Sequence, residues 1–444
     1  MEDIKKFCVV SCPISSRSGY GARSRDFVRA LIEARPEWDI NILSQRWGNT
    51  PMDALVPGED DDLLSKIIMK KEDRKPNIWI QITVPNEFHP VGDYNIGVTA
   101  GVEQTVFPPE CLEGVNRMDK VLVSSNFSKE VMEKAMYDRK DKATDKLLSQ
   151  LKLEKPVEVL FEGIDLNVYD NKAPSEERLD ELMKQIKEPF CFLFVGHWLN
   201  GEFRQDRKNI SGLIQTFCEA FKNKSKKPAL ILKTNAGGNS LMDRVRLKKM
   251  INQIKDSVEG KNLPNIYLLH SDLTDWEMNA LYNHPKVKAH VSFTRGEGFG
   301  RPLLEATISG KPMVVSAWSG QVDFLNKDMV TTIGGNLTKV HPSAADGKYI
   351  LEDGSWFEID YGVAGGVMRD IYDNYKKYLE KSRKHRKYTK DRFSFDHMRD
   401  LLSEQLKDAD NAKTSPQQVG LKLPKLKKKE ETQSLELPKL KKID

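Results

Sequence analysis

The sequence has no apolar run near the ~18 residues that a membrane-spanning helix needs. It also lacks the basic start and apolar stretch of a secretory signal. Its first residues, MEDIKKFCVV, carry acids and lead almost directly into a strand-like run. These absences exclude an integral membrane protein, and we expect a cytoplasmic protein without a transmembrane segment.

Cysteine is scarce. The five cysteines are an odd number and are widely scattered, and Cys8 and Cys12 share one predicted strand. No further Cys or His pair completes a zinc set. We therefore expect small buried thiols, as in FCFLFVG around Cys191, and we expect no metal site.

An excess of positive charge is also missing from most of the chain. Residues 413 to 444 contain nine lysines against four acidic residues, which accounts for the whole net charge of +5. The remainder is formally neutral and has no nucleic-acid signature. We predict that residues 408–444 form a disordered basic tail, in which LPKLKK occurs twice, from Leu423 and from Leu437.

Two common nucleotide motifs are absent. Gly310 and Lys311 are followed by proline and lack the upstream spacing of a P-loop. The glycine-rich stretch RGEGFGRPLLEA, residues 295–306, has its glycines at alternate positions and lies far from the first strand, so it is no dinucleotide fingerprint.

Short apolar runs alternate with helical patterns in two successive series, which predicts two parallel sheets flanked by helices and a cleft between them. We expect a first domain over 1–170, a second over 186–365 and a helical return segment over 366–407. The predicted strands are 6–14, 39–44, 77–83, 94–99, 119–125 and 156–163, then 190–196, 228–234, 265–270, 286–293, 311–317 and 329–334.

The stretch RGEGFGRPLLEA combines a strand end, a glycine turn and a helix start with Pro302. Free backbone N–H groups at such a start bind anions. A phosphate alone would be repelled by Glu297, whereas a carboxylate accepts hydrogen bonds from a diol. The ligand that presents both groups is a nucleotide sugar. A tight connection without a ligand and a pair of glycosidase carboxylates are the alternative interpretations.

EGFGRPLLE, with Glu297 and Glu305 separated by seven residues, resembles the E-x7-E signature of family 4 retaining glycosyltransferases. Further matches are ISSRSGYG, FEGID and VGHWLNGEFRQDRKNI, in the family's order. The resemblance covers roughly residues 5 to 400. It implies an α/β protein with the GT-B fold, in which two Rossmann-like domains face a central cleft and a C-terminal helix returns to the first domain.

The resemblance also implies roles for individual residues. Glu305 would bind the donor ribose, Glu297 the transferred sugar, and Lys208 the donor phosphate. Glu297 and Lys208 are thus the expected catalytic residues. The remaining implied donor-binding residues are Arg207, Gly298, Phe299, Gly300, Gly19, Gly21 and His197.

Two positions depart from the family pattern. His197 stands where the family has an arginine that clamps the diphosphate with the lysine. The clamp is therefore either incomplete, with weaker binding of the diphosphate, or completed by Arg204 or Arg207. Many members also place a histidine near the acceptor, where this chain has AGVEQT. Glu103 and His89 are the two candidates for that position.

The implied activity is sugar transfer with retention from a UDP- or GDP-sugar, with no required cofactor and an optional divalent metal. The expected acceptor is a glycan or a small molecule, and modified DNA, reached through the basic tail, is an alternative. A rival hypothesis is an inactive GT-B platform that docks a protein partner through LPKLKK.

Overall fold

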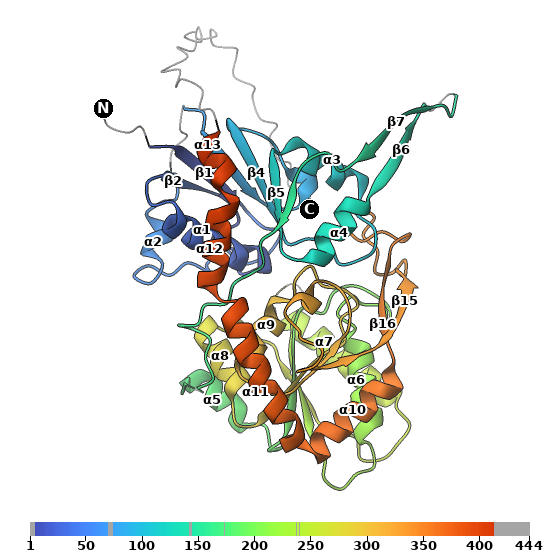
Figure 1. Ribbon diagram of the computed structural model, residues 1–444. Coiled ribbons are helices and arrows are strands. Elements are labelled where there is room, and N and C mark those ends of the chain that lie inside the picture. Colours follow the sequence, from blue (N-terminus) through green and yellow to red (C-terminus); the bar gives the residue numbers. More distant parts are fainter. Residues whose placement is uncertain are drawn as a thin grey trace, which may run out of the picture.

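The computed structural model describes residues 5–69, 74–141, 144–172, 174–236, 238 and 240–412. Figure 1 shows two α/β units, one from each half of the chain, joined by crossing segments on one side. The predicted tail begins within α13 at its residue 408, and its residues from 413 onward, with both LPKLKK repeats, lie outside the described residues.

The first sheet has six parallel strands in the order β2-β1-β3-β4-β5-β8. Its order reverses between β1 and β3, and ligands of such sheets bind beyond the strand carboxyl ends at this point. The strands are β1 (Phe7–Cys12), β2 (Asp39–Ser44), β3 (Ile78–Ile82), β4 (Tyr94–Thr99), β5 (Lys120–Val123) and β8 (Val157–Val159).

The second sheet is also parallel and six-stranded, in the order β11-β10-β9-β12-β13-β14. This is the Rossmann order, with its switch point between β9 and β12. The strands are β9 (Cys191–Val195), β10 (Ala229–Lys233), β11 (Ile266–Leu269), β12 (Val287–Ser292), β13 (Met313–Ser316) and β14 (Thr331–Ile333). The glycine-rich stretch follows β12 at this switch point.

Helices connect the strands and cover the sheets (Figure 1). They are α1 (Gly19–Ala34), α2 (Asp61–Leu64), α3 (Pro109–Arg117), α4 (Asn126–Lys134), α5 (Glu177–Lys184), α6 (Ile210–Phe221), α7 (Leu241–Asp256), α8 (Asp275–Asn283), α9 (Arg301–Ile308), α10 (Tyr361–Asp373), α11 (Tyr375–Arg392), α12 (Phe395–Gln405) and α13 (Lys407–Asn411), with two 3₁₀ turns, η1 (Pro85–Glu87) and η2 (Gly320–Asp323).

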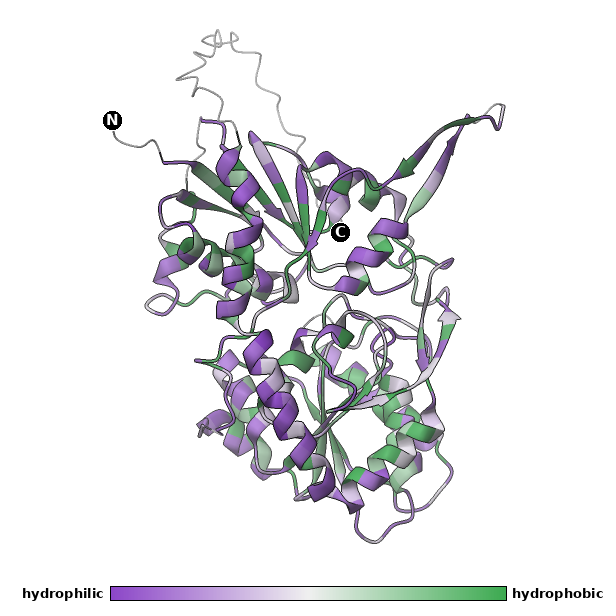
Figure 2. Ribbon diagram, viewed as in Figure 1, coloured by the Kyte–Doolittle hydropathy of each residue, from purple (hydrophilic) through white to green (hydrophobic). Residues whose placement is uncertain are grey.

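The sheets form the cores, because their central strands are buried on both faces. Figure 2 shows hydrophobic residues concentrated in the strands, while α11 is largely hydrophilic. The expectation of buried thiols is confirmed, since all five cysteines are free and buried. Burial raises the pKa of the Cys111 thiol to about 11, so it stays protonated at neutral pH.

Two antiparallel hairpins were not predicted. They are β6 (Met136–Lys140) with β7 (Leu147–Lys152), and β15 (Gly335–Lys339) with β16 (Ser355–Ile359). The first projects from the N-terminal unit (Figure 1). Its strands are largely exposed and polar, so they lack the apolar runs that reveal the parallel strands. The second is joined to the first unit by the Thr105 N–H, which donates to the Ser355 carbonyl at 2.9 Å.

The C-terminal helices cross between the units. Helix α11 packs against α9, and α12 packs against α1 (Figure 1). At the crossing, the Ile164 N–H donates to the Phe393 carbonyl and the Phe395 N–H donates to that of Ile164. The expected return of the last helix to the first unit is confirmed. No helix among the described residues is long and apolar enough to span a membrane.

Candidate active site

The glycine turn connects β12 to α9 and leaves backbone donors free. Gly300 is the N-cap residue and has φ +99°, a left-handed conformation that glycine adopts without strain. No acceptor among the described residues bonds to the N–H groups of Phe299, Gly300 or Arg301. Unpaired N–H groups at a helix start form an anion site, as the sequence predicted for this turn.

The first two glycines of the turn face the first sheet's loops. A Cβ built on Gly296 would lie 1.9 Å from the carbonyl oxygen of Glu103, and one on Gly298 would lie 2.1 Å from that of Ala100. The Ser125 hydroxyl donates to the Gly298 carbonyl at 2.6 Å. Glycine at 296 and 298 therefore lets the two units interlock, a function that the sequence analysis did not assign to them.

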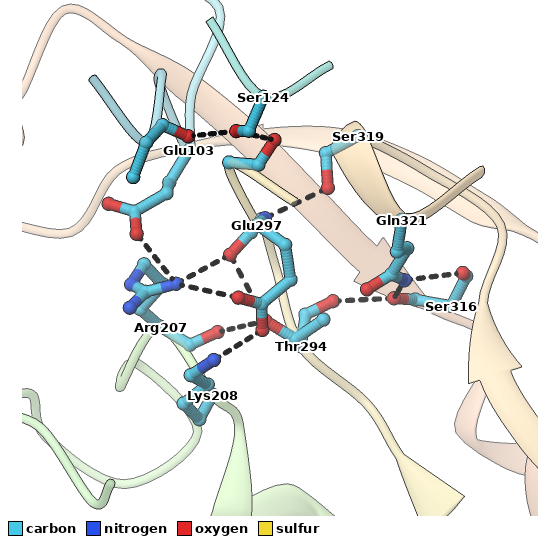
Figure 3. A network of polar contacts seen from close by, with 12 residues as sticks. Glu103, Ser124, Arg207, Lys208, Thr294, Glu297, Ser316, Ser319 and Gln321 are labelled. Carbon is cyan, nitrogen blue, oxygen red and sulfur yellow. Dashed lines mark hydrogen bonds and ion pairs between the residues drawn. The ribbon is translucent and has the colours of Figure 1, made fainter. Parts of the chain in front are cut away.

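Glu297 lies between two cations (Figure 3). Lys208 Nζ lies 2.5 Å from one carboxylate oxygen, and Arg207 Nη1 lies 3.4 Å from the other. Arg207 Nη1 also lies 3.0 Å from Glu103 Oε1 of the first unit. Burial would raise the pKa of Glu297, but Lys208 and Arg207 outweigh it and hold that pKa below its usual value. Glu297 is therefore ionised, and Lys208 is held at the turn.

Glu305 lies further along α9 and has a different environment. It accepts from the Tyr282 hydroxyl at 3.0 Å and from Arg301 Nε at 3.0 Å. Arg301 also pairs with Asp26 on α1. Burial raises the pKa of Glu305 to about 7, against the attraction of Arg301. Two carboxylates of one short motif thus have pKa values shifted in opposite directions.

His197, Arg204 and Arg207 are the residues that bear on the diphosphate clamp, and the structure distinguishes them. His197 Nδ1 lies 2.5 Å from Asn235 Oδ1 in a part-buried contact. The pKa of His197 is lowered first by desolvation and then by nearby cations that include Lys208. The Arg204 guanidinium lies 4.3 Å from the ring centroid of Tyr361. Of the two candidate arginines, it is Arg207 that lies beside Lys208 and Glu297.

A second glycine turn lies in the first unit, at the start of α1. The Ser18 side chain caps the Gly21 N–H, while no described acceptor bonds to the N–H of Gly19 or Tyr20. A Cβ on Gly19 would meet nothing within 4 Å, whereas one on Gly21 would lie 2.0 Å from the Ser16 carbonyl. Gly19 thus borders open space, and Gly21 is required for the tight turn.

Aromatic packing fixes this first turn. The Tyr20 hydroxyl lies 2.9 Å from Thr99 Oγ1, and the Tyr20 and Trp47 rings stack with centroids 4.2 Å apart. Trp47 is half-buried.

The two acceptor candidates are placed differently. Glu103 forms an ion pair with Arg207, which also contacts Glu297. His89 is exposed, and the contacts described for it are local. Its ring Nδ1 lies 2.7 Å from the Glu87 carbonyl oxygen, and its backbone N–H donates to Gln81 Oε1. Of the two, Glu103 is the one that contacts the site.

The sequence did not reveal Arg301 and Tyr282 as partners of Glu305, or Asp26 as a partner of Arg301. Arg301 stands four residues before Glu305, which on a helix is contact spacing, so its pairing was detectable. Asp26 and Tyr282 come from distant elements and give no local signal. No group of three or more His, Cys, Asp or Glu within the described ranges could hold a metal ion.

No protein-family model matches the chain, and no curated protein matches it either. Solved structures do. A glycosyltransferase from Rickettsia africae superposes with TM-score 0.61 and 13% identity, over 92% of this chain and 100% of that one. A sucrose-phosphate synthase from Thermosynechococcus elongatus gives 0.58 and 11%, over 92% and 100%.

Anabaena HepE, solved with UDP-glucose, gives TM-score 0.55 and 13% identity over 90% of this chain and 100% of that one. These neighbours and the two six-stranded parallel sheets establish the architecture. The chain has the GT-B fold, in which two Rossmann-like domains face each other.

Proposed function

We propose that this protein is a retaining glycosyltransferase that transfers a hexose from a nucleotide-diphosphate sugar to an acceptor hydroxyl. The observation that carries the proposal is the row of unpaired N–H groups at Phe299, Gly300 and Arg301, which lies on the turn whose Glu297 holds Lys208 at 2.5 Å. The structural neighbour HepE, solved with UDP-glucose, supports it.

The diphosphate binds the free N–H groups of the turn, and Lys208 turns from Glu297 to a phosphate oxygen. The N–H groups of Gly19 and Tyr20 approach the diphosphate from the opposite domain. Lys208 and these dipoles stabilise the charge that develops on the leaving diphosphate, which is the dominant contribution expected of a preorganised site.

The carboxylates bind the sugars. Glu297, released by Lys208, accepts from hydroxyls of the transferred hexose, and Glu305 accepts from the ribose. Arg207 stays between Glu297 and Glu103 and keeps Glu297 ionised.

In the transfer step the acceptor oxygen attacks C1 of the hexose on the face from which the diphosphate leaves. The bond from C1 to the phosphate oxygen breaks, and the acceptor proton passes to that oxygen. No enzyme nucleophile is needed, so most of the rate arises from positioning and electrostatics. A divalent metal is optional because Lys208 and the N–H groups supply positive charge.

The acceptor is a glycan or a small molecule on this proposal, and modified DNA remains the alternative because of the basic residues 413–444. The acceptor would enter beside Tyr20 and Trp47, where Gly19 borders open space.

A screen of UDP-, GDP-, ADP- and CMP-sugars, read by thermal shift and by slow donor hydrolysis, tests the proposal. One nucleotide should raise the melting temperature and be hydrolysed. Both effects should be lost in Lys208→Ala and retained in Lys184→Ala, which removes an exposed lysine on α5. Failure of every donor to stabilise the wild type would refute the proposal.

A further inference from the structure

Glu162 is a buried carboxylate at the junction of the two domains. It follows β8 in FEGID and is 6% exposed. No N–H or O–H of the described part of the chain donates to its side chain. Its carboxylate oxygens are not completely enclosed by protein atoms, so a ligand can reach them. A buried carboxylate is normally paired, which makes this one unusual.

The backbone around Glu162 is held in place on both sides. Arg23 donates to the carbonyls of Leu160 and Phe161 at 2.5 and 2.8 Å. The Ile164 N–H donates to the Phe393 carbonyl at 2.9 Å, where the C-terminal segment crosses. Since these contacts fix the backbone, the position of the side chain is preorganised and not a consequence of loop freedom.

Charges from both domains act on this carboxylate. In decreasing order they are Arg23, Arg301, Asp26 and Glu297. Arg23 and Asp26 belong to α1, while Arg301 and Glu297 belong to the glycine turn and the start of α9. Glu162 therefore lies where the charges of α1 and of the donor turn meet, and Asp26 of α1 pairs directly with Arg301. Burial raises its pKa.

A phosphate would be repelled by this carboxylate, while a hydroxyl would satisfy it. The glycine turn whose charges act on Glu162 is the proposed donor site, and a nucleotide sugar carries hydroxyls on its ribose and on its hexose. An ionised acceptor binds such hydroxyls more strongly than a neutral one.

We propose that Glu162 is a third sugar-binding carboxylate of the cleft, supplied by the first domain, and that it accepts a hydrogen bond from a hydroxyl of the bound donor. This inference rests on the proposed function and deepens it. The chemistry is the same whether the hydroxyl belongs to the ribose or to the hexose, and the experiment separates the two.

Calorimetric titration of wild type, Glu162→Gln and Glu158→Gln tests this inference. Glu158 is the matched control, since it lies on β8 and is paired with Lys120 at 3.1 Å. The ligands are the nucleoside diphosphate and the diphosphate sugar that bind the wild type, UDP and UDP-glucose first. Glu162→Gln should weaken binding of the diphosphate sugar about tenfold or more, and Glu158→Gln less than twofold.

The affinity for the nucleoside diphosphate without the hexose shows whether Glu162 binds a ribose or a hexose hydroxyl. If Glu162 binds the hexose, UDP affinity stays within twofold of wild type. If it binds the ribose, UDP weakens as much as UDP-glucose. Glu162→Asp, which keeps the charge on a shorter side chain, should show an intermediate loss, and melting curves of all variants confirm that they are folded.

Wild-type affinity of Glu162→Gln for both ligands would overturn the inference and leave the proposed function intact. Failure of the wild type itself to bind any nucleotide sugar would instead remove the proposed function, and this inference with it.

Discussion

The two glycine turns, one in each domain, have the same local backbone design but are surrounded by different side chains. Each follows a strand of a parallel sheet near its switch point, starts a helix and leaves backbone N–H groups free. The turn before α9 is flanked by Glu297, Lys208 and Arg207. The turn before α1 is held by serine and by the stacked rings of Tyr20 and Trp47.

Backbone N–H groups can bind an anion, whereas the side chains around them determine which ligand is preferred. Free N–H groups on both sides suit a phosphate. The buried ion pairs of Glu297 lie at the second turn, whereas at the first turn Arg17 pairs with the exposed Asp53. A ligand that is anionic in the middle and rich in hydroxyls at its ends therefore takes its specific contacts from the second domain. From the first domain, Glu103 pairs with Arg207 and Asp26 pairs with Arg301, so these carboxylates meet cations of the second domain.

Removing the cation of the charged turn should have the largest effect. Lys208→Ala is expected to reduce donor hydrolysis by roughly 10²- to 10³-fold, the cost of deleting one stabilising donor at a leaving group. Steady-state kinetics measure it, with Lys184→Ala as the control. Wild-type kcat in Lys208→Ala would mean that the charged turn is not the donor site.

The glycines of the charged turn should resist a side chain. Gly298→Ala places a Cβ 2.1 Å from the Ala100 carbonyl and forces the domains apart, at an expected cost of about 1–3 kcal/mol as for other overpacked sites. Melting temperature measures it. Gly366→Ala on α10, whose nearest neighbour is 4.0 Å away, is the matched control and should be neutral or stabilising. Equal melting temperatures for both variants would argue against the interlocked turn.

The two carboxylates of the charged turn should differ in their pH dependence. Glu305 has a pKa of about 7, so it is mostly protonated at pH 6 and mostly ionised at pH 8. Its ionised form is the better acceptor for ribose hydroxyls, so affinity for a diphosphate sugar should rise up to about tenfold between these values. Titrations at several pH values measure this.

Glu305→Gln should remove that rise and bind more weakly at pH 8. A rise of the same size in Glu305→Gln would assign the titration to another group. Glu297, whose pKa is lowered, should contribute no pH dependence in this range.

A change in the aromatic packing of the first turn should have little effect on donor binding. Trp47→Ala removes the ring that stacks on Tyr20 and deletes no charge, so donor affinity should stay within about twofold, as for substitutions that touch no bound group. A tenfold loss of donor affinity would show that the first turn contributes more than backbone N–H groups.

The apolar runs of the sequence located each parallel strand, because a strand buried on both faces must be continuously hydrophobic. The motif EGFGRPLLE placed the turn and both carboxylates on one helix start. The hairpins β6–β7 and β15–β16 were missed, since their exposed strands need no such runs.

The ion pairs could not be predicted from the sequence for a different reason. Lys208 and Glu297 are 89 positions apart, and Arg301 and Asp26 are 275 apart, so only the folded chain brings them together. The sequence likewise left Arg204 and Arg207 as equal candidates for the clamp. The αL backbone of Arg204 and its stacking on Tyr361 separate it from Arg207.

A structure of the protein with the donor found in the screen tests the central claim most directly. We predict phosphate oxygens within hydrogen-bonding distance of the N–H groups of Phe299 and Gly300, with Lys208 turned from Glu297 to the diphosphate. A nucleotide bound elsewhere, with Lys208 still paired to Glu297 and no phosphate at the turn, would contradict the account.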